Sequence, residues 1–207
     1  RDKLVTGVQT CALPIWRWLA ATGVLPTDPT RAIEIRRADR QSPDSFTEAE
    51  RKRMLKEVAA RKGSAAARDL VMLEVFLNTG VRLAELVNLD VTDVDLDCKR
   101  ITIRAKGGHV ETRFLNSGLR TTLRKYLRRR ADMPSHASAL FLSNRNERIS
   151  TRQVQTRFEQ WLAWAGIDRP GLTVHSLRHT FGTRLYRKTH DLRSEERRVG
   201  KECRSRW

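Results

Sequence analysis

The stretch "TVHSLRHTFGTRL", residues 173–185, places two histidines and an arginine on adjacent turns of a predicted helix that runs from about Val174 to Lys188. His175 and Arg178 have i, i+3 spacing, so on a helix they project from the same face and can reach one ligand. A lone histidine or a lone surface arginine is ordinarily structural. The pair therefore supports a functional hypothesis only if residues of matching chemistry exist elsewhere in the chain.

A metal site is the alternative interpretation of this helix. His175 and His179 have the i, i+4 spacing of two zinc ligands on a metalloprotease helix. Ser176, however, stands where such a helix carries its glutamate, and no third ligand is indicated. We therefore expect no metal and no other cofactor.

A second candidate stretch is "NTGVRLAELVNL", in which Gly80 is expected to end one helix in the left-handed conformation. Arg82 then opens a short predicted helix, residues 82–88, with Glu85 three positions later. An ion pair worth roughly 0.3 kcal/mol is the ordinary interpretation. Because the helix macrodipole disfavours a cation at the N-terminus, a binding site for an anion is a better reason for Arg82.

The third candidate is Lys106 in "KRITIRAKGGHVETRFL". Ile101 and Ile103 alternate with charged and polar residues, which predicts a β-hairpin with a two-residue turn at Gly107-Gly108. Lys106 lies at the mouth of that turn, where its ammonium group projects beyond the strands. An ordinary turn lysine is the alternative.

The net charge points to a polyanionic partner. The 207 residues include 41 Lys and Arg against 24 Asp and Glu, which gives a formal charge of +17 and a pI near 11.0. We recognise neither an apolar run of about 18 residues nor a secretory leader, so we expect no membrane partner and a cytoplasmic, nucleoid-associated protein. Three widely spaced cysteines without a metal-binding pattern are expected to be free thiols: Cys11, Cys98 and Cys203.

Hydrophobic periodicity predicts a mainly α-helical fold with a small antiparallel β-hairpin or sheet, an α+β class. Phe46, Thr47 and Glu50 match a hydrophobic staple and a capping box that open a helix through about Arg61. Further helices are expected around residues 70–79, from an N-cap at Ser117, and from Thr151.

The composition also suggests domain boundaries. Residues 1–15 and 194–207 resemble translated sequencing-adapter sequence, and we expect neither to belong to the natural protein. Together they carry a net charge of +3, so +14 belongs to the rest of the chain. A helix end and a linker containing three prolines are predicted over residues 16–45, and a separate domain over residues 46–193.

The three candidate stretches together resemble the tyrosine recombinases, the phage integrase family. "TGVRLAELVNL" is similar to the first arginine box of the family, "KGGHVETRFLN" to its lysine hairpin, and "HSLRHTFGTRL" to its second box, in the same order and at similar spacing. The resemblance covers about Phe46 to Arg193, and residues 16–40 resemble the end of the core-binding domain and its linker. It implies subunits that assemble as a tetramer on double-stranded DNA and cut and rejoin its strands.

The resemblance assigns roles to the site residues. Arg82 and Arg178 would neutralise the charge that develops on a phosphodiester, for which bidentate guanidinium groups are suited. Lys106 would protonate the leaving 5′ oxygen, and His175 would assist proton transfer and bind the phosphate. Two residues would have supporting roles: Glu85, which would orient the histidine or arginine beside it, and His179.

The nucleophile of the family is a tyrosine on a helix roughly thirty residues beyond the second arginine. Tyr126 precedes the second box, and Tyr186 follows Arg178 by only eight residues, so neither matches. We therefore expect this chain to be a fragment without the nucleophile. A non-catalytic DNA-binding protein that retains the fold is the alternative, whereas a metal-dependent nuclease would need a carboxylate cluster that the sequence lacks.

A predicted DNA-binding face lies on the helix that begins at Thr151. Arg152, Gln153 and Arg157 are in its first turns, and its other face is apolar, which is typical of a helix that contacts a groove or phosphates. Arg113, in the lysine hairpin, is the fourth predicted DNA-binding residue. The arginines at positions 120, 124 and 128 fit a solvated basic face as well as they fit a DNA-binding face.

Overall fold

The computed structural model describes residues 8–30, 45–104, 109–133 and 138–189. The chain divides into two compact units, Arg1–Ser42 and Pro43–Trp207. In the first unit, helix α1 (Val8–Ala21) begins well before Trp16, where we expected only the last turns of a helix. The second unit carries all other described helices and strands.

Helix α2 (Glu48–Ala59) begins at the predicted capping box. Thr47 Oγ1 accepts the N–H of Glu50 at 3.2 Å, and Glu50 Oε2 accepts the N–H of Thr47 at 2.8 Å. Arg169 also donates from Nη1 to Glu50 Oε2 at 3.0 Å, so the same carboxylate ties the start of α2 to the loop before α7. Phe46 is buried beside this cap, as expected for a staple residue.

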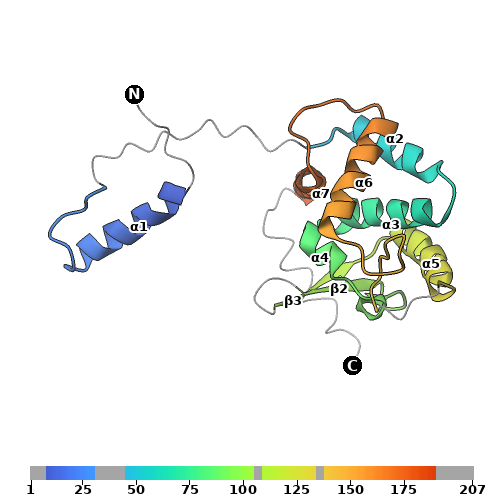
Figure 1. Cartoon of the computed structure of the whole chain (residues 1–207), viewed down its shortest axis with the longest axis horizontal. Helices are drawn as coiled ribbons and strands as arrows, with labels where there is room; N and C mark the ends of the chain where they lie inside the picture. Colours follow the sequence, from blue (N-terminus) through green and yellow to red (C-terminus); the bar gives the residue numbers. More distant parts are fainter. Residues whose placement is uncertain (1–7, 31–44, 105–108, 134–137, 190–207) are drawn as a thin grey trace. The chain divides into compact units, whose positions relative to one another are not determined.

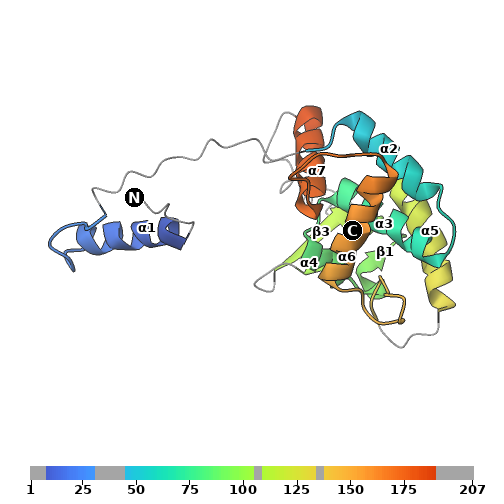
Figure 2. The same ribbon diagram turned by 45° about the horizontal axis from the view of Figure 1, so that its top comes forward.

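The central helix of the second unit is α3 (Ser64–Thr79), which packs against α2, α5 and α7 (Figures 1 and 2). It ends at Gly80, whose φ of 65° is the predicted left-handed C-cap. The short helix α4 (Leu83–Val87) follows directly, with Arg82 as its N-cap. Both expectations for this stretch, a left-handed Gly80 and a short helix opened by Arg82, are therefore confirmed.

The sheet has three antiparallel strands in the order β1 (Val94–Asp95), β2 (Arg100–Arg104) and β3 (Val110–Phe114). Strand β1 was not expected, because two residues carry no readable alternation. The last pair of the register within the described residues is Arg104 with Val110. The predicted two-residue turn at Gly107-Gly108 and Lys106 both fall within residues 105–108, which lie outside the described residues.

Helix α5 (Ser117–Ala131) has Asn116 rather than Ser117 as its N-cap. Asn116 is in the extended conformation and its Oδ1 accepts the N–H of Leu119 at 2.8 Å, which leaves Ser117 as the first helical residue. Leu119, Leu123 and Tyr126 are buried, and α5 packs against α3. The expected cap is thus wrong by one residue.

Helices α6 (Thr151–Trp164) and α7 (Val174–Thr189) complete the second unit and match the predicted helices. The core is centred on large side chains with less than 2% exposure, which include Phe76, Phe141 and Trp161. The observed fold is mainly helical with a small antiparallel sheet, as predicted. None of the helices within the described ranges is long and apolar enough to cross a membrane.

Candidate active site and nucleic-acid interface

Arg82 is held at the start of α4 by the glutamate one turn later. Its N–H donates to Glu85 Oε2 at 2.7 Å and its Nη1 donates to Glu85 Oε1 at 2.6 Å. The hydrogen bond and charge of Glu85 raise the pKa of Arg82 above its ordinary value. The Arg82 side chain is 55% exposed and that of Glu85 only 9%. The guanidinium of Arg82 is therefore open to solvent while a largely buried carboxylate holds it in place.

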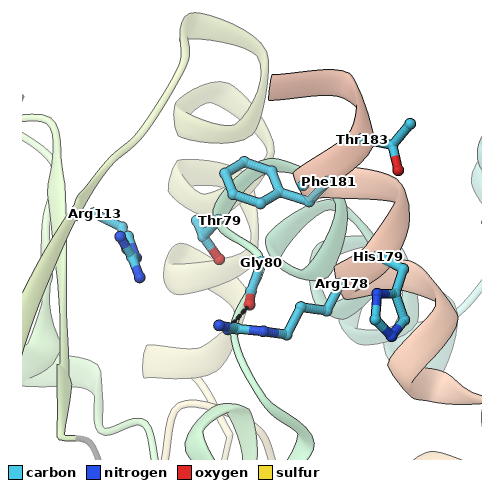
Figure 3. A pocket seen from close by; sticks show the side chains of 8 residues that line it. Thr79, Gly80, Arg113, Arg178, His179, Phe181 and Thr183 are labelled. Atoms are coloured by element: carbon cyan, nitrogen blue, oxygen red, sulfur yellow. Dashed lines mark hydrogen bonds between the residues drawn. The ribbon is translucent and has the colours of Figure 1, made fainter. Parts of the chain in front are cut away.

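Arg178 reaches from α7 to the turn that precedes Arg82. Its Nη1 donates a hydrogen bond to the carbonyl oxygen of Gly80, which joins residues 98 positions apart in the sequence (Figure 3). Phe181, one turn further along α7, packs over the same glycine, and a Cβ at Gly80 would lie 2.9 Å from Phe181 Cε1. The structure therefore brings the two arginine-bearing stretches together at one left-handed glycine.

His175 and His179 lie on successive turns of α7. Their rings meet edge to face with centroids 4.5 Å apart, and His175 is exposed. Burial lowers the pKa of His179, and the nearby charges of His175 and Arg178 lower it further. A neutral His179 suits a supporting role beside the exposed His175.

A cleft of about 250 Å³ lies between the Gly80 turn, strand β3 and α7. Arg178 and His179 line it from α7, and Arg113 lines it from β3, while Phe181 closes one side (Figure 3). The cleft therefore gathers one arginine predicted for catalysis with one predicted for DNA binding. Lys106 lies outside the described residues.

The α6 residues predicted to bind DNA line a second hollow, of about 410 Å³, together with the loop around Asn144. Within the described part of the chain, Arg152 makes no hydrogen bond or ion pair and is exposed. The side chain of Gln153 caps α6, because its Oε1 accepts the N–H of Ser150 at 2.9 Å. Only Arg152 therefore presents an unengaged charge at this end of α6.

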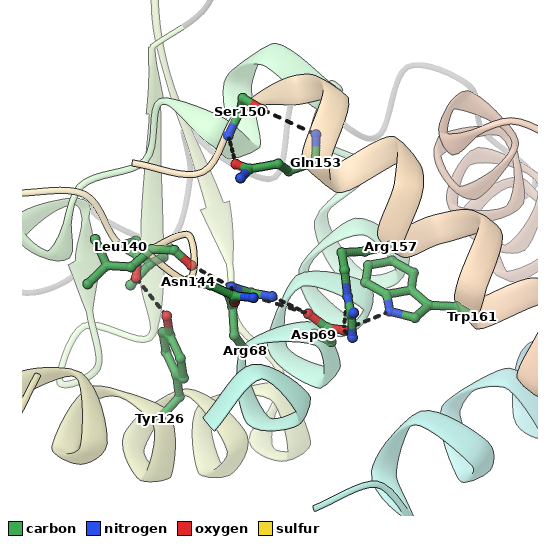
Figure 4. A network of polar contacts seen from close by, with 10 residues as sticks. Arg68, Asp69, Tyr126, Leu140, Asn144, Ser150, Gln153, Arg157 and Trp161 are labelled. Atoms are coloured by element: carbon green, nitrogen blue, oxygen red, sulfur yellow. Dashed lines mark hydrogen bonds and ion pairs between the residues drawn. The ribbon is translucent and has the colours of Figure 1, made fainter. Parts of the chain in front are cut away.

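Arg157 is partly exposed but is paired with a buried carboxylate, which the sequence did not indicate. Its Nε donates to Asp69 Oδ2 at 2.6 Å, and its Nη2 contacts the same oxygen (Figure 4). Asp69 is fully buried and also accepts from Arg68 Nη2 at 3.2 Å and from Trp161 Nε1 at 3.2 Å. The geometry assigns Arg157 a structural contact between α6 and α3.

The two tyrosines differ in solvent exposure. Tyr126 is 2% exposed and donates from its hydroxyl to the carbonyl of Leu140 at 2.9 Å (Figure 4). Burial raises the pKa of Tyr126 to about 12. Tyr186 is 47% exposed, but lies eight residues beyond Arg178 on α7, about 12 Å along the helix axis. Neither hydroxyl is placed beside the Arg178 guanidinium.

No group of three His, Cys, Asp or Glu side chains that could hold a metal ion occurs in the ranges that the structure describes. Cys98, the cysteine whose state is described, is a free thiol and is exposed.

The fold and the paired arginine stretches define the class of the protein. The model of the phage integrase family matches residues 44–201, which is more than half of the chain. The chain therefore belongs to this family, the tyrosine recombinases.

Individual relatives agree with this class. Tyrosine recombinase XerC of Serratia marcescens is 33% identical over 183 residues, which cover 88% of this chain and 59% of that protein. XerC of Salmonella typhi is 32% identical, with coverage of 88% and 60%. The chain thus spans about three fifths of the length of these curated relatives.

Solved structures show the same fold. The crystal structure of XerA recombinase has a TM-score of 0.68 and 32% identity, and the match covers 77% of this chain and 57% of that chain. A λ integrase dimer bound to a COC′ core site has a TM-score of 0.64 at 18% identity, over 94% of this chain and 70% of that chain. The second likeness is one of fold alone.

Proposed function

We propose that this chain is part of the catalytic domain of a site-specific DNA recombinase, which cleaves and rejoins strands through a 3′-phosphotyrosine intermediate. The observation that carries the proposal is the hydrogen bond from Arg178 to Gly80, two residues before Arg82. It brings the Arg178 guanidinium to the turn from which Arg82 opens α4. Two fixed guanidiniums suit the charge that develops on the non-bridging oxygens of a phosphodiester during displacement.

Each remaining site residue has a role in this scheme. Glu85 holds the backbone and side chain of Arg82, so it positions the cation without touching DNA. His175 is exposed on the same face of α7 as Arg178 and would bind the phosphate or transfer its proton. Lys106 is proposed as the acid that protonates the leaving 5′ oxygen, and His179 supports His175.

The DNA duplex is proposed as the partner, and further subunits as partners in a tetrameric synapse. A net charge of +17 supports binding to a polyanion, and association with the nucleoid follows from that binding. On the protein surface we assign DNA contacts to Arg152, Gln153 and Arg113, while Arg157 is engaged by Asp69. The λ integrase dimer bound to a COC′ core site, which shares this fold, supports this partner.

Binding of DNA without cleavage is the second candidate, and the tyrosine positions favour it for the isolated chain. Tyr126 is buried and Tyr186 is displaced along α7 from Arg178. Both candidates predict duplex binding, and they differ in whether the site can cleave once a nucleophile is supplied.

Cleavage is tested with the chain extended by the C-terminal segment of the Serratia marcescens XerC. A library of nicked duplexes with randomised sequence is incubated with this fusion, and covalent protein–DNA adducts are captured. The recombinase proposal predicts adducts that disappear with Arg82→Ala and with Arg178→Ala and persist with Arg128→Ala, an exposed arginine on α5. Adducts that survive either site substitution would refute the proposed clamp.

A further inference from the structure

Strand β3 carries its charged and apolar residues on unexpected faces. The register places Arg113 opposite Ile101 and Glu111 opposite Ile103, and both isoleucines are buried in the core. Directly paired residues share a face, so Arg113 and Glu111 point toward the body of the protein. A strand with one buried face ordinarily places its apolar residues there. On β3 the ion pair takes that face instead.

The apolar residues of β3 lie on the opposite face. Val110 is 64% exposed and Phe114 is 43% exposed. Shifting the register by one residue would exchange the two faces and bury both apolar side chains. The observed register therefore keeps Arg113 toward the cleft, with Glu111 on the same face of β3, at the cost of apolar burial, which indicates that this pair has a purpose other than core packing.

Two guanidinium groups enter the cleft from different elements. Arg113 extends from β3 and Arg178 from α7, and Figure 3 shows both directed toward the space beside Gly80. An arginine has five N–H donors. Within the described residues, Arg113 donates to Glu111 Oε2 at 2.7 Å and Arg178 donates to the Gly80 carbonyl. Most of their donors therefore remain for a ligand with several anionic oxygens.

Glu111 is the acidic partner of Arg113. Its side chain is 45% exposed, whereas that of Arg113 is 19% exposed. After the stronger effect of Glu85, Glu111 also contributes to raising the pKa of Arg82. A carboxylate so exposed to water forms a weak ion pair, which a phosphate can replace without leaving a buried charge unpaired.

We infer that Arg113 is a further phosphate ligand in the cleft, beside Arg178, and that Glu111 holds its guanidinium in place until the phosphate replaces the carboxylate. The ligand is a phosphodiester of the DNA backbone, an identity that rests on the proposed function. Arg113 thus binds substrate directly, while Glu111 is a positioning residue that competes with it. No covalent step is involved.

The first test uses the whole chain and inorganic phosphate, and so does not depend on DNA. NMR of the arginine Nε–Hε groups, assigned with Arg113→Lys and Arg178→Lys, follows a phosphate titration. The inference predicts shifts of both the Arg113 and Arg178 signals, and a larger Arg113 shift in Glu111→Gln. A titration that moves Arg178 but leaves Arg113 unchanged would overturn it.

The second test measures duplex affinity by fluorescence anisotropy over a range of salt concentrations. Arg113→Gln should reduce the slope of log K against log salt by about one, because one phosphate contact is lost, and Arg113→Lys should retain that slope. Glu111→Gln should raise affinity about threefold or more in the presence of Arg113 and much less in Arg113→Gln. Equal increases in both backgrounds would mean that Glu111 acts only through net charge, which contradicts the inference.

The two tests separate this inference from the proposed function. If phosphate shifts the Arg113 signal while no variant binds duplex DNA, the phosphate site stands and the DNA function fails. If the duplex binds with the expected salt dependence but Arg113 affects neither test, the DNA function stands and Arg113 is not a ligand. Arg128→Gln serves as the matched control for loss of one exposed arginine.

Discussion

Removal of the Asp69 carboxylate should destabilise the second unit strongly. Asp69 has 0% side-chain exposure, and its partners Arg68 and Arg157 are 7% and 24% exposed. Without the carboxylate, the Arg68 cation stays buried with no acidic partner among the described residues. Breaking a buried ion pair by removing one member costs about 3–5 kcal/mol, and domains of this size are stable by only about 5–15 kcal/mol.

The two substitutions at this position should differ in degree. Asp69→Ala leaves the two guanidiniums and the indole N–H of Trp161 without their acceptor, so its loss should lie near the upper end of that range. Asp69→Asn keeps the shape and one carbonyl oxygen, so its loss should lie near the lower end. Asp168→Asn, an exposed aspartate, is the matched control.

Equilibrium urea unfolding measures these losses. Tryptophan fluorescence is a suitable signal, because Trp161 donates its indole N–H to the same carboxylate. Arg157→Met should also lower stability, but at concentrations where the protein is folded it should bind duplex DNA as the unmodified chain does. A loss below about 1 kcal/mol for Asp69→Ala, comparable to the control, would refute the account of this network.

Gly80→Ala should lower the free energy of unfolding by about 1–3 kcal/mol, because φ is 65° and the added methyl group meets the Phe181 ring. The control is Gly182→Ala, which adds its methyl group in open space on α7 and should be neutral or stabilising. Urea unfolding of both variants checks this. Burial raises the pKa of Glu74, whose Oε2 has no hydrogen-bond partner in the described residues, so its neutral form is favoured in the folded protein. Stability is then lost as pH rises through the raised pKa, and Glu74→Gln should be more stable than the unmodified chain at neutral pH, with the difference vanishing near about pH 4. The chain alone should form no covalent adduct on nicked duplex DNA, and an adduct that Tyr186→Phe abolishes would contradict the placement of that hydroxyl.

Local features were predictable from the sequence. The capping box of α2 and the left-handed Gly80 depend on residues within four positions of one another, so residue types alone indicate them. The face shared by His175 and Arg178 follows from helical periodicity in the same way. These features place each half of the candidate site, although they do not show that the halves meet.

Features that depend on distant residues were not predictable. The sequence predicts that Arg157 is a surface cation of α6. In the fold it pairs with Asp69, 88 positions earlier in the sequence. The inward orientation of Arg113 follows from the strand register, and the apolar Val110 and Phe114 would have favoured the opposite face. The hydrogen bond between Arg178 and Gly80 likewise spans 98 positions.

The central claim is that Arg82 and Arg178 act on one phosphate, and a double-mutant cycle in duplex affinity tests it most directly. Affinities of the unmodified chain, Arg82→Ala, Arg178→Ala and the double variant are measured at one salt concentration, with Arg82→Ala combined with Arg128→Ala as the control pair. The account predicts that the double site variant loses clearly less affinity than the two single losses combined, because either substitution already impairs the shared contact. Losses at Arg82 and Arg178 that simply add, as those of the control pair should, would contradict a shared phosphate.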